Sequence, residues 1–304
     1  RRIEQAEHYV LVQFFIVRDD ALGRRMLNAL AACVRRGAAV YFLYDQLGSH
    51  RLSRHYVEDL RQAGVQVQVF KTGTSLPNRF QINFRNHRKI VVVDGDWATT
   101  GGVNLGEEYL GHTEQFGHWR DTMVAVEGPA VQEIQLAFAE DWYFRTNETP
   151  AWNWMPQEHP ASGQSVLVLP TGPADALHTC SMMFTQVIHT AENRLWITSP
   201  YFVPDKEIVR ALQLAAMRGV DVRILLPHEP DHLMVYWASF TYLEELERTG
   251  VRFFRYTAGL LHEKVVLVDD WLALVGTANT DNRSFYLNFE LTLLVADSAF
   301  ASEV

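Results

Sequence analysis

The chain carries one five-residue pattern twice, and this duplication limits its possible folds more than any other feature. The pattern, His-x-Lys-x4-Asp-x6-Gly-x2-Asn, begins at His87 and again 175 positions later at His262. Five fixed residues at about 5% usage each match by chance roughly once in three million starting positions. We therefore expect two similar halves, each built around one copy of the pattern.

The residues around the two copies also repeat and predict an α/β fold. Ala6–Val12 resembles Ala191–Ile197, and an apolar helical pattern that ends in Arg-Gly follows each segment. Each copy then runs into an apolar, β-branched stretch, Lys89–Val93 or Lys264–Val268. Such runs are typical of strands covered on both faces. Alternating strands and helices indicate mixed, mainly parallel sheets, with the halves packed in pseudo-twofold symmetry so that equivalent edges face each other.

Prolines and glycine interrupt the periodic pattern between residues 145 and 164, which predicts a linker there. The predicted division is 1–148 for the N-terminal half, 149–163 for the linker and 164–304 for the C-terminal half.

Composition excludes several classes of protein. Lys and Arg number 27 against 36 Asp and Glu, and the resulting net charge of −9 disfavours a protein that wraps nucleic acid. Two cysteines are too few for a disulfide scaffold or a cysteine-rich zinc site. With neither HExxH nor EF-hand spacing, no metal or cofactor is predicted. The sequence contains no apolar run of transmembrane length, and its start at Arg1 without methionine indicates a fragment.

The chemistry of the motif residues favours reaction at a phosphodiester. Residues two apart on a strand share a face, so His87 lies beside Lys89, and His262 beside Lys264. A neutral imidazole can attack phosphorus while a protonated one donates to the departing alkoxide. Lysine ammoniums and asparagine amides are suitable donors to the charged phosphoryl oxygens. These expected donors are Lys89, Lys264, Asn104 and Asn279.

The duplicated pattern resembles that of the phospholipase D superfamily, and further segments are similar to bacterial cardiolipin synthases. Those segments are Asn86–Gly95, Trp119–Asp121, Glu127–Ala130, Ser199–Pro204, Gly276–Phe285 and Leu287–Glu290. The resemblance implies one active site formed by both halves and a phosphohistidine intermediate. It implies that His87 is the nucleophile and His262 the acid, and that Asp121 and Glu290 orient the histidines.

The same resemblance implies transfer of a phosphatidyl group between two phosphatidylglycerol molecules, with release of glycerol. It places the enzyme at the bacterial cytoplasmic membrane, with this chain as the soluble catalytic part and any anchor outside it. A hydrolytic phospholipase D shares the same site chemistry and remains the alternative. A nuclease is less favoured because the chain is acidic, and a non-catalytic lipid-binding scaffold because both motifs are complete. The sequence does not indicate an oligomeric state.

Other residues carry weaker expectations. Asp94 and Asp269 each end an apolar strand before a turn, where a carboxylate often caps backbone amides, so a structural role is favoured. The segment from Lys71 to Lys89 has five basic residues and no acidic one. It predicts an approach path for anionic lipid, and a solvated loop is the alternative. The candidates are Lys71, Arg79 and Arg85. Tyr201 and Phe202 could line a lipid pocket or pack in the core.

Overall fold

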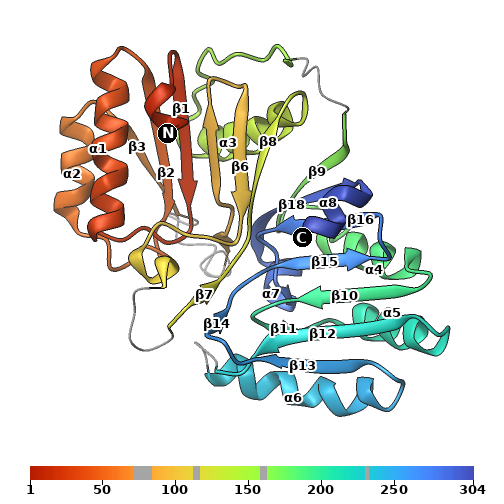
Figure 1. Ribbon diagram of the computed structural model, residues 1–304. Coiled ribbons are helices and arrows are strands. Elements are labelled where there is room, and N and C mark those ends of the chain that lie inside the picture. Colours follow the sequence, from red (N-terminus) through yellow and green to blue (C-terminus); the bar gives the residue numbers. More distant parts are fainter. Residues whose placement is uncertain (72–83, 112–116, 158–162, 230–232) are drawn as a thin grey trace. The chain divides into compact units, whose positions relative to one another are not determined.

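A computed structural model describes residues 1–71, 84–111, 117–157, 163–229 and 233–304 (Figure 1). They form two compact units, the first comprising residues 1–110 and 123–163, the second residues 111–122 and 164–304. Segment 111–122 therefore belongs with the second unit, whereas the sequence-based division placed it in the N-terminal half. The reason is a strand pair: β7 (Trp119–Arg120) lies parallel to β14 (Leu260–Leu261).

The first unit is built on a six-stranded mixed sheet of order β3-β2-β1-β5-β6-β8. β1, β2 and β3 are parallel, and the pairs β1–β5, β5–β6 and β6–β8 are antiparallel. The strands are β1 (Tyr9–Phe14), β2 (Ala39–Asp45), β3 (Gln66–Phe70), β5 (Ile90–Val93), β6 (Trp97–Gly101) and β8 (Met123–Glu127). The helices are α1 (Ala21–Arg35), α2 (Arg54–Gln62) and α3 (Ala130–Thr146), and the short elements are η1 (Ile3–Gln5), β4 (Arg85–Asn86) and η3 (Glu107–Leu110).

Alternate side chains of this sheet pack on different helices, as the two-residue period of a strand requires. Val10 and Val12 of β1 join a fully buried core with Leu30 of α1 and Leu60 of α2. On the opposite face of the sheet, Tyr41 of β2 meets Trp142 of α3 edge to face. Helices thus cover both faces, and Figure 1 shows α1 and α2 side by side on one of them.

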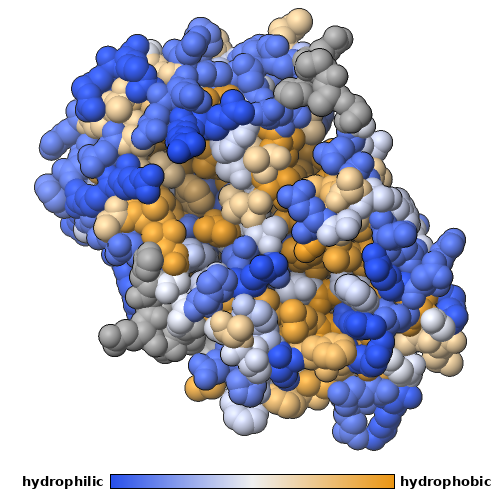
Figure 2. Space-filling model, in the orientation of Figure 1, coloured by the Kyte–Doolittle hydropathy of each residue, from blue (hydrophilic) through white to orange (hydrophobic). Residues whose placement is uncertain are grey.

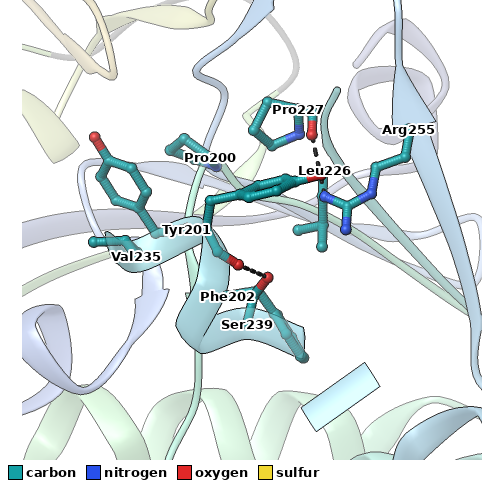
Figure 3. A pocket seen from close by; sticks show the side chains of 9 residues that line it. Pro200, Tyr201, Phe202, Leu226, Pro227, Val235, Ser239 and Arg255 are labelled. Atoms are coloured by element: carbon teal, nitrogen blue, oxygen red, sulfur yellow. Dashed lines mark hydrogen bonds between the residues drawn. The ribbon is translucent and has the colours of Figure 1, made fainter. Parts of the chain in front are cut away.

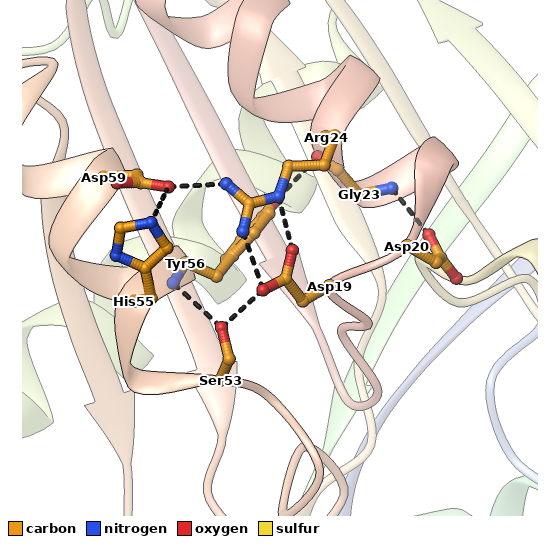
Figure 4. Close-up of polar contacts among 8 residues, drawn as sticks. All are labelled: Asp19, Asp20, Gly23, Arg24, Ser53, His55, Tyr56 and Asp59. Carbon is orange, nitrogen blue, oxygen red and sulfur yellow. Dashed lines mark hydrogen bonds and ion pairs between the residues drawn. The ribbon is translucent and has the colours of Figure 1, made fainter.

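A polar cluster joins α1 to α2 (Figure 4). The Arg24 guanidinium donates to Asp19 and, over 2.5 Å, to Asp59 of α2. The hydrogen bond from Arg24 is the main cause that lowers the pKa of Asp19 below its ordinary value, whereas burial acts in the opposite direction. Ser53 donates to Asp19 and caps α2 by accepting from the Tyr56 amide. These contacts fix the register of the two helices.

The second unit repeats the same sheet order, as β13-β12-β10-β15-β16-β18, and β9 pairs antiparallel with β18. Its strands are β9 (Ser165–Thr171), β10 (Arg194–Thr198), β11 (Phe202–Val203), β12 (Asp221–Pro227), β13 (Arg252–Tyr256), β15 (Val265–Val268), β16 (Leu272–Gly276), β17 (Thr280–Asp281) and β18 (Asn288–Ala296). Its helices are α4 (Thr179–Thr190), α5 (Lys206–Met217), α6 (Leu233–Glu247), α7 (Asn282–Tyr286) and α8 (Ser298–Glu303). The prediction of two similar α/β halves is confirmed.

Mixed sheets are likewise confirmed, but the expectation of mainly parallel pairing is wrong for the strands that follow each motif. β5 returns as β6 through residues 94–96, and β15 returns as β16 through residues 269–271. Three-residue connections can form only antiparallel hairpins, because a parallel pair needs a crossover of a dozen residues or more.

The two units also share helix caps. Asp20 accepts from the amide of Gly23 at the start of α1, and Asp205 accepts from that of Ile208 at the start of α5, both over 2.8 Å. Within the described parts of the chain, no helix is both long and apolar enough to cross a bilayer. Hydrophilic and hydrophobic residues both reach the surface that Figure 2 shows.

Candidate active site

The first motif holds its histidine and lysine just ahead of β5 rather than within it. Lys89 is fully buried, and its Nζ donates to the His87 carbonyl oxygen over 2.6 Å. The ring of Phe15 meets the His87 imidazole edge to face, with 4.9 Å between centroids, and lies 5.5 Å from the Lys89 ammonium. Both motif side chains therefore lie on the side of Phe15, as the shared-face argument predicts, although the segment is not a strand.

Arg88, the residue between them, is buried and holds residues 87–89 in place through hydrogen bonds to α3. Arg88 Nη1 donates to Asp141 of α3 over 3.0 Å, and both side chains are 4% exposed. The same carboxylate oxygen accepts from Gln13 and Asn86, over 2.8 and 2.7 Å. Sequence reasoning missed Gln13 and Asp141. The available signal was Arg88 itself, since a basic side chain on the opposite face from two site residues needs a buried partner.

The second motif brings its histidine, its lysine and a buried carboxylate together. His262 Nδ1 lies 2.6 Å from Asp121 Oδ2 and 2.9 Å from Lys264 Nζ, and Lys264 also donates to the His262 carbonyl oxygen. The Trp119 ring meets the imidazole edge to face at 5.7 Å. Asp121, proposed from sequence as an orienting carboxylate, thus contacts His262.

Charge in this cluster decides the tautomer of the ring. Burial opposes ionisation of Asp121, but the charges of Lys264 and His262 and the hydrogen bond from His262 together hold its pKa below its ordinary value. An ionised carboxylate can only accept, so Nδ1 carries the hydrogen that it shares with Asp121. Lys264 Nζ then cannot donate to Nδ1; it donates to the His262 carbonyl oxygen, and its charge acts on Asp121. In the neutral ring the other nitrogen, Nε2, then carries the lone pair.

Glu263, between the second histidine and lysine, has the role that Arg88 has in the first copy. Its Oε1 accepts from Arg120 Nε over 2.8 Å and from Thr122 Oγ1 over 2.7 Å. Since Arg120 and Thr122 flank Asp121, these bonds hold the carboxylate beside His262. Neither residue was identified from sequence, because nothing local links positions about 140 residues apart.

The pairing of β7 with β14 delivers Asp121 and depends on a glycine. His118 accepts from the Leu260 amide over 2.9 Å, and Arg120 accepts from the His262 amide over 2.8 Å. Gly259 has φ +134°, and a Cβ on it would lie 2.0 Å from the His118 carbonyl oxygen. No side chain fits this backbone conformation and this approach.

Gly259→Ala is therefore expected to lower the free energy of unfolding by about 1–3 kcal/mol, since it strains the backbone and separates the paired segments. Thermal unfolding of the variant measures this effect. Gly163→Ala is the matched control, because a Cβ there meets nothing within 4 Å. Equal melting temperatures for the two variants would contradict the structural role of Gly259.

Glu290 lies in the core of the second unit and is fully buried. Its carboxylate accepts from Thr277 Oγ1 over 2.5 Å and from Asn288 Nδ2 over 3.0 Å. Asp281 is buried in the same unit. Burial is the main cause that raises the pKa of Asp281 to about 6, and the charge of Glu290 adds to it. Through Thr277, Glu290 contacts the second motif two residues before Asn279.

The two motif asparagines have different local partners. Asn104 Oδ1 accepts from the Ile16 amide over 3.0 Å, and its Nδ2 donates to the Tyr109 hydroxyl over 2.5 Å. The Asn279 backbone amide donates to Ser284 Oγ, whereas its side-chain Oδ1 is buried and has no hydrogen-bond partner among the described residues.

The two motif aspartates serve the fold. Asp94 accepts from three consecutive backbone amides, of Glu7, His8 and Tyr9, over 2.7–2.9 Å. Asp269 accepts in the same way from residues 192, 193 and 194 over 2.7–3.2 Å. Although burial acts against it, these amides hold the pKa of Asp269 below its ordinary value. Each carboxylate ties the turn after the motif strand to the start of the central strand, which supports the expected structural role.

The three lipid-approach candidates are described only in part. Lys71 is half-buried directly after β3, and its carbonyl oxygen accepts from Arg145. Arg85 is half-buried and donates to the Phe84 carbonyl oxygen over 2.7 Å. Arg79 lies outside the described residues. Among the residues that the structure describes, no group of three or more His, Cys, Asp or Glu side chains is arranged to hold a metal ion.

Comparison with known proteins identifies a family to which the chain is similar. Residues 1–142 and 184–304 match the family described as "Cardiolipin synthase, PLD-like domain". The chain is 53% identical over 304 residues to cardiolipin synthase A of Pseudomonas aeruginosa. The aligned region covers all of this chain and 62% of that protein. The chain thus spans 62% of the length of this curated relative.

Two solved structures share the fold. Phosphatidylserine synthase of Haemophilus influenzae Rd KW20 has a TM-score of 0.67 at 17% identity, over 99% of this chain and 79% of that chain. Polyphosphate kinase of Porphyromonas gingivalis has a TM-score of 0.62 at 14% identity, over 98% of this chain and 42% of that chain. At these identities the likeness concerns the fold alone.

Proposed function

Since the chain belongs to the family of phospholipase D-like domains of cardiolipin synthase, we propose that it transfers a phosphatidyl group between two phosphatidylglycerol molecules. The products are cardiolipin and glycerol. The observation that carries the proposal is the second-motif cluster, in which a buried, ionised Asp121 lies on Nδ1 of His262 and Lys264 lies beside both. Its motif recurs in full at His87.

The proposed reaction has two displacements at one phosphorus. His87 attacks the phosphodiester, a phosphorus–nitrogen bond forms, and the bond to the glycerol oxygen breaks. His262 gives its proton to that departing oxygen. A hydroxyl of the second phosphatidylglycerol then attacks the phosphohistidine and returns a proton to His262, and His87 leaves. Both histidines end in their starting states.

The role of acid goes to His262 because of its partner. A carboxylate on Nδ1 stabilises the positive form of the ring, in which Nε2 carries the proton that can be donated. Lys89, Lys264 and the amides of the motif asparagines would neutralise the phosphoryl oxygens. Glu290 is proposed as the carboxylate that orients the other histidine.

A hydrolytic phospholipase D is the second candidate, since water could resolve the same intermediate. Incubation of the chain with phosphatidylglycerol vesicles, followed by thin-layer chromatography, distinguishes the two. Cardiolipin with released glycerol is the expected result. Phosphatidic acid as the sole lipid product would establish hydrolysis instead.

The proposed substrate lies in an anionic bilayer, and we propose the bacterial cytoplasmic membrane as the place of action. Neutralising Lys71, Arg79 and Arg85 together is expected to weaken binding to phosphatidylglycerol vesicles and to raise the apparent KM for lipid. Each basic residue near an anionic surface contributes about 1 kcal/mol, less at high salt. Turnover of a short soluble phosphodiester is expected to change little. Vesicle cosedimentation across a salt series measures the binding.

A matched control removes equal charge elsewhere in the first unit, at the exposed residues Arg25, Arg35 and Arg51. If this control weakened vesicle binding as much, only net charge would matter. The segment would then be a solvated loop.

A further inference from the structure

The first two turns of α6 expose large apolar side chains. Leu233, Met234, Trp237 and Phe240 have exposed fractions of 65%, 87%, 66% and 44%. Trp237 follows Leu233 by four residues and Met234 by three, and Phe240 follows Trp237 by three, which places them along one side of the helix. No charged residue occurs from Leu233 to Leu243, and the acidic residues of α6 are confined to its end. Single exposed apolar residues are ordinary, but a contiguous group marks an interaction surface.

A cation lies under this surface. The guanidinium carbon of Arg255, near the end of β13, is 5.1 Å from the ring centroid of Tyr236 and 5.6 Å from that of Phe240. Arg255 donates to the Pro227 carbonyl oxygen over 3.1 Å, as Figure 3 shows. No carboxylate of the described residues pairs with it. In a chain of net charge −9, a positive group beside an apolar face matches an anionic lipid surface.

The inner side of α6 closes a shallow pocket at the carboxyl ends of β10, β12 and β13. Val235 and Ser239 of α6 line it with Tyr201, Phe202 and Arg255 (Figure 3). Within the second unit this edge also carries the second motif, because Thr198 at the end of β10 pairs with Val265, the residue after Lys264. The apolar face of α6 therefore belongs to the edge of the sheet that holds His262 and Lys264.

We propose that Leu233, Met234, Trp237 and Phe240 form a membrane-contacting face that inserts into an anionic phospholipid bilayer, with Arg255 near the lipid phosphates. The inference deepens the proposed function and rests on it, since it names how the second unit meets a substrate that lies in a membrane. Tryptophan and phenylalanine suit the boundary between headgroups and acyl chains. A bilayer suits this face because, within the described part of α6, large apolar side chains are exposed next to a cation.

The test compares two double variants by cosedimentation with vesicles of phosphatidylglycerol and phosphatidylcholine. Met234→Glu/Trp237→Glu is expected to lower the partition coefficient by about 10-fold or more, since it places two charges in an apolar contact. Leu214→Glu/Met217→Glu on α5 is the matched control. It has the same three-residue spacing and starting exposures of 51% and 71%, and it is expected to change binding by less than about 2-fold. Equal effects of the two variants, or none, would overturn the proposal.

Arg255→Gln tests the charge separately. It is expected to weaken binding to vesicles that contain phosphatidylglycerol and to leave the weaker binding to pure phosphatidylcholine unchanged. Equal loss on both vesicles would refute the role of Arg255. Melting temperatures verify folding, and Met234→Ser/Trp237→Gln replaces the charged pair if that variant unfolds.

Two further outcomes separate this inference from the proposed function. If vesicle binding depends on the α6 residues but no cardiolipin forms, the proposed function is refuted and the membrane-contacting face is supported. Cardiolipin formation with vesicle binding that ignores the α6 substitutions would refute the surface and keep the function. A change in oligomeric state in the absence of vesicles, with unchanged vesicle binding, would assign the face to a second copy of the chain and overturn the proposal.

Discussion

The His87→Ala variant is expected to form no covalent phosphoenzyme, whereas His262→Ala still forms one slowly from a substrate whose leaving group needs no proton. The difference follows from dividing nucleophile and acid between two imidazoles. Without His87 there is no nitrogen to bond to phosphorus. Without His262 the nucleophile remains, and only departure of a poor leaving group is blocked.

Trapping of labelled lipid on acid-quenched protein measures this prediction. His55→Ala is the control, since that histidine is 74% exposed and belongs to neither motif. It is expected to retain full labelling. Label that persists in His87→Ala and disappears from His262→Ala would reverse the assignment of nucleophile and acid.

Local signals in the sequence account for most of the fold. β-Branched runs mark β5 and β15, which are almost entirely buried, as strands covered on both faces should be. The direction of pairing between β5 and β6 was predicted less well, because the expectation of parallel pairing ignored how few residues separate the two strands. A connection of that length decides between parallel and antiparallel pairing more firmly than composition does.

The candidate site was predictable where its residues belong to the repeated pattern. The sequence could not predict that segment 111–122 belongs to the second unit. This depends on the pairing of two short strands, β7 and β14, which have two residues each and lie about 140 residues apart in the chain. Strands that short carry no periodicity to detect. Likewise, Asp141 supports the first motif through Arg88 from a helix 53 residues away, and only tertiary structure brings such partners together.

Asp121→Asn is expected to lower turnover of phosphatidylglycerol by roughly 10²- to 10⁴-fold while the protein still folds. An asparagine can present its amide N–H to Nδ1, and this would shift the ring hydrogen to Nε2 in the neutral form and remove the negative charge that stabilises the imidazolium. Glu290→Gln is expected to cost a similar factor if Glu290 orients the other histidine. Asp270→Asn, which changes an exposed carboxylate in the same unit, is the control and is expected to keep full activity.

A purely structural role for Asp121 predicts equal losses on every substrate, so the decisive measurement compares leaving groups. If Asp121 acts through His262, the loss is large on phosphatidylglycerol and much smaller on a phosphodiester whose leaving group needs no proton. The pH dependence has a definite sign as well. Because the pKa of Asp121 is lowered in the folded protein, the ionised group stabilises the fold above its ordinary pKa near 4, and this contribution is lost only as pH falls below that value. At neutral pH this contribution is fully present and Asp121→Asn loses it, so the melting temperature of the variant is measured beside its turnover to show that the protein remains folded. Equal losses on both substrates, or near-normal turnover with an unchanged melting temperature, would show that His262 does not depend on this carboxylate.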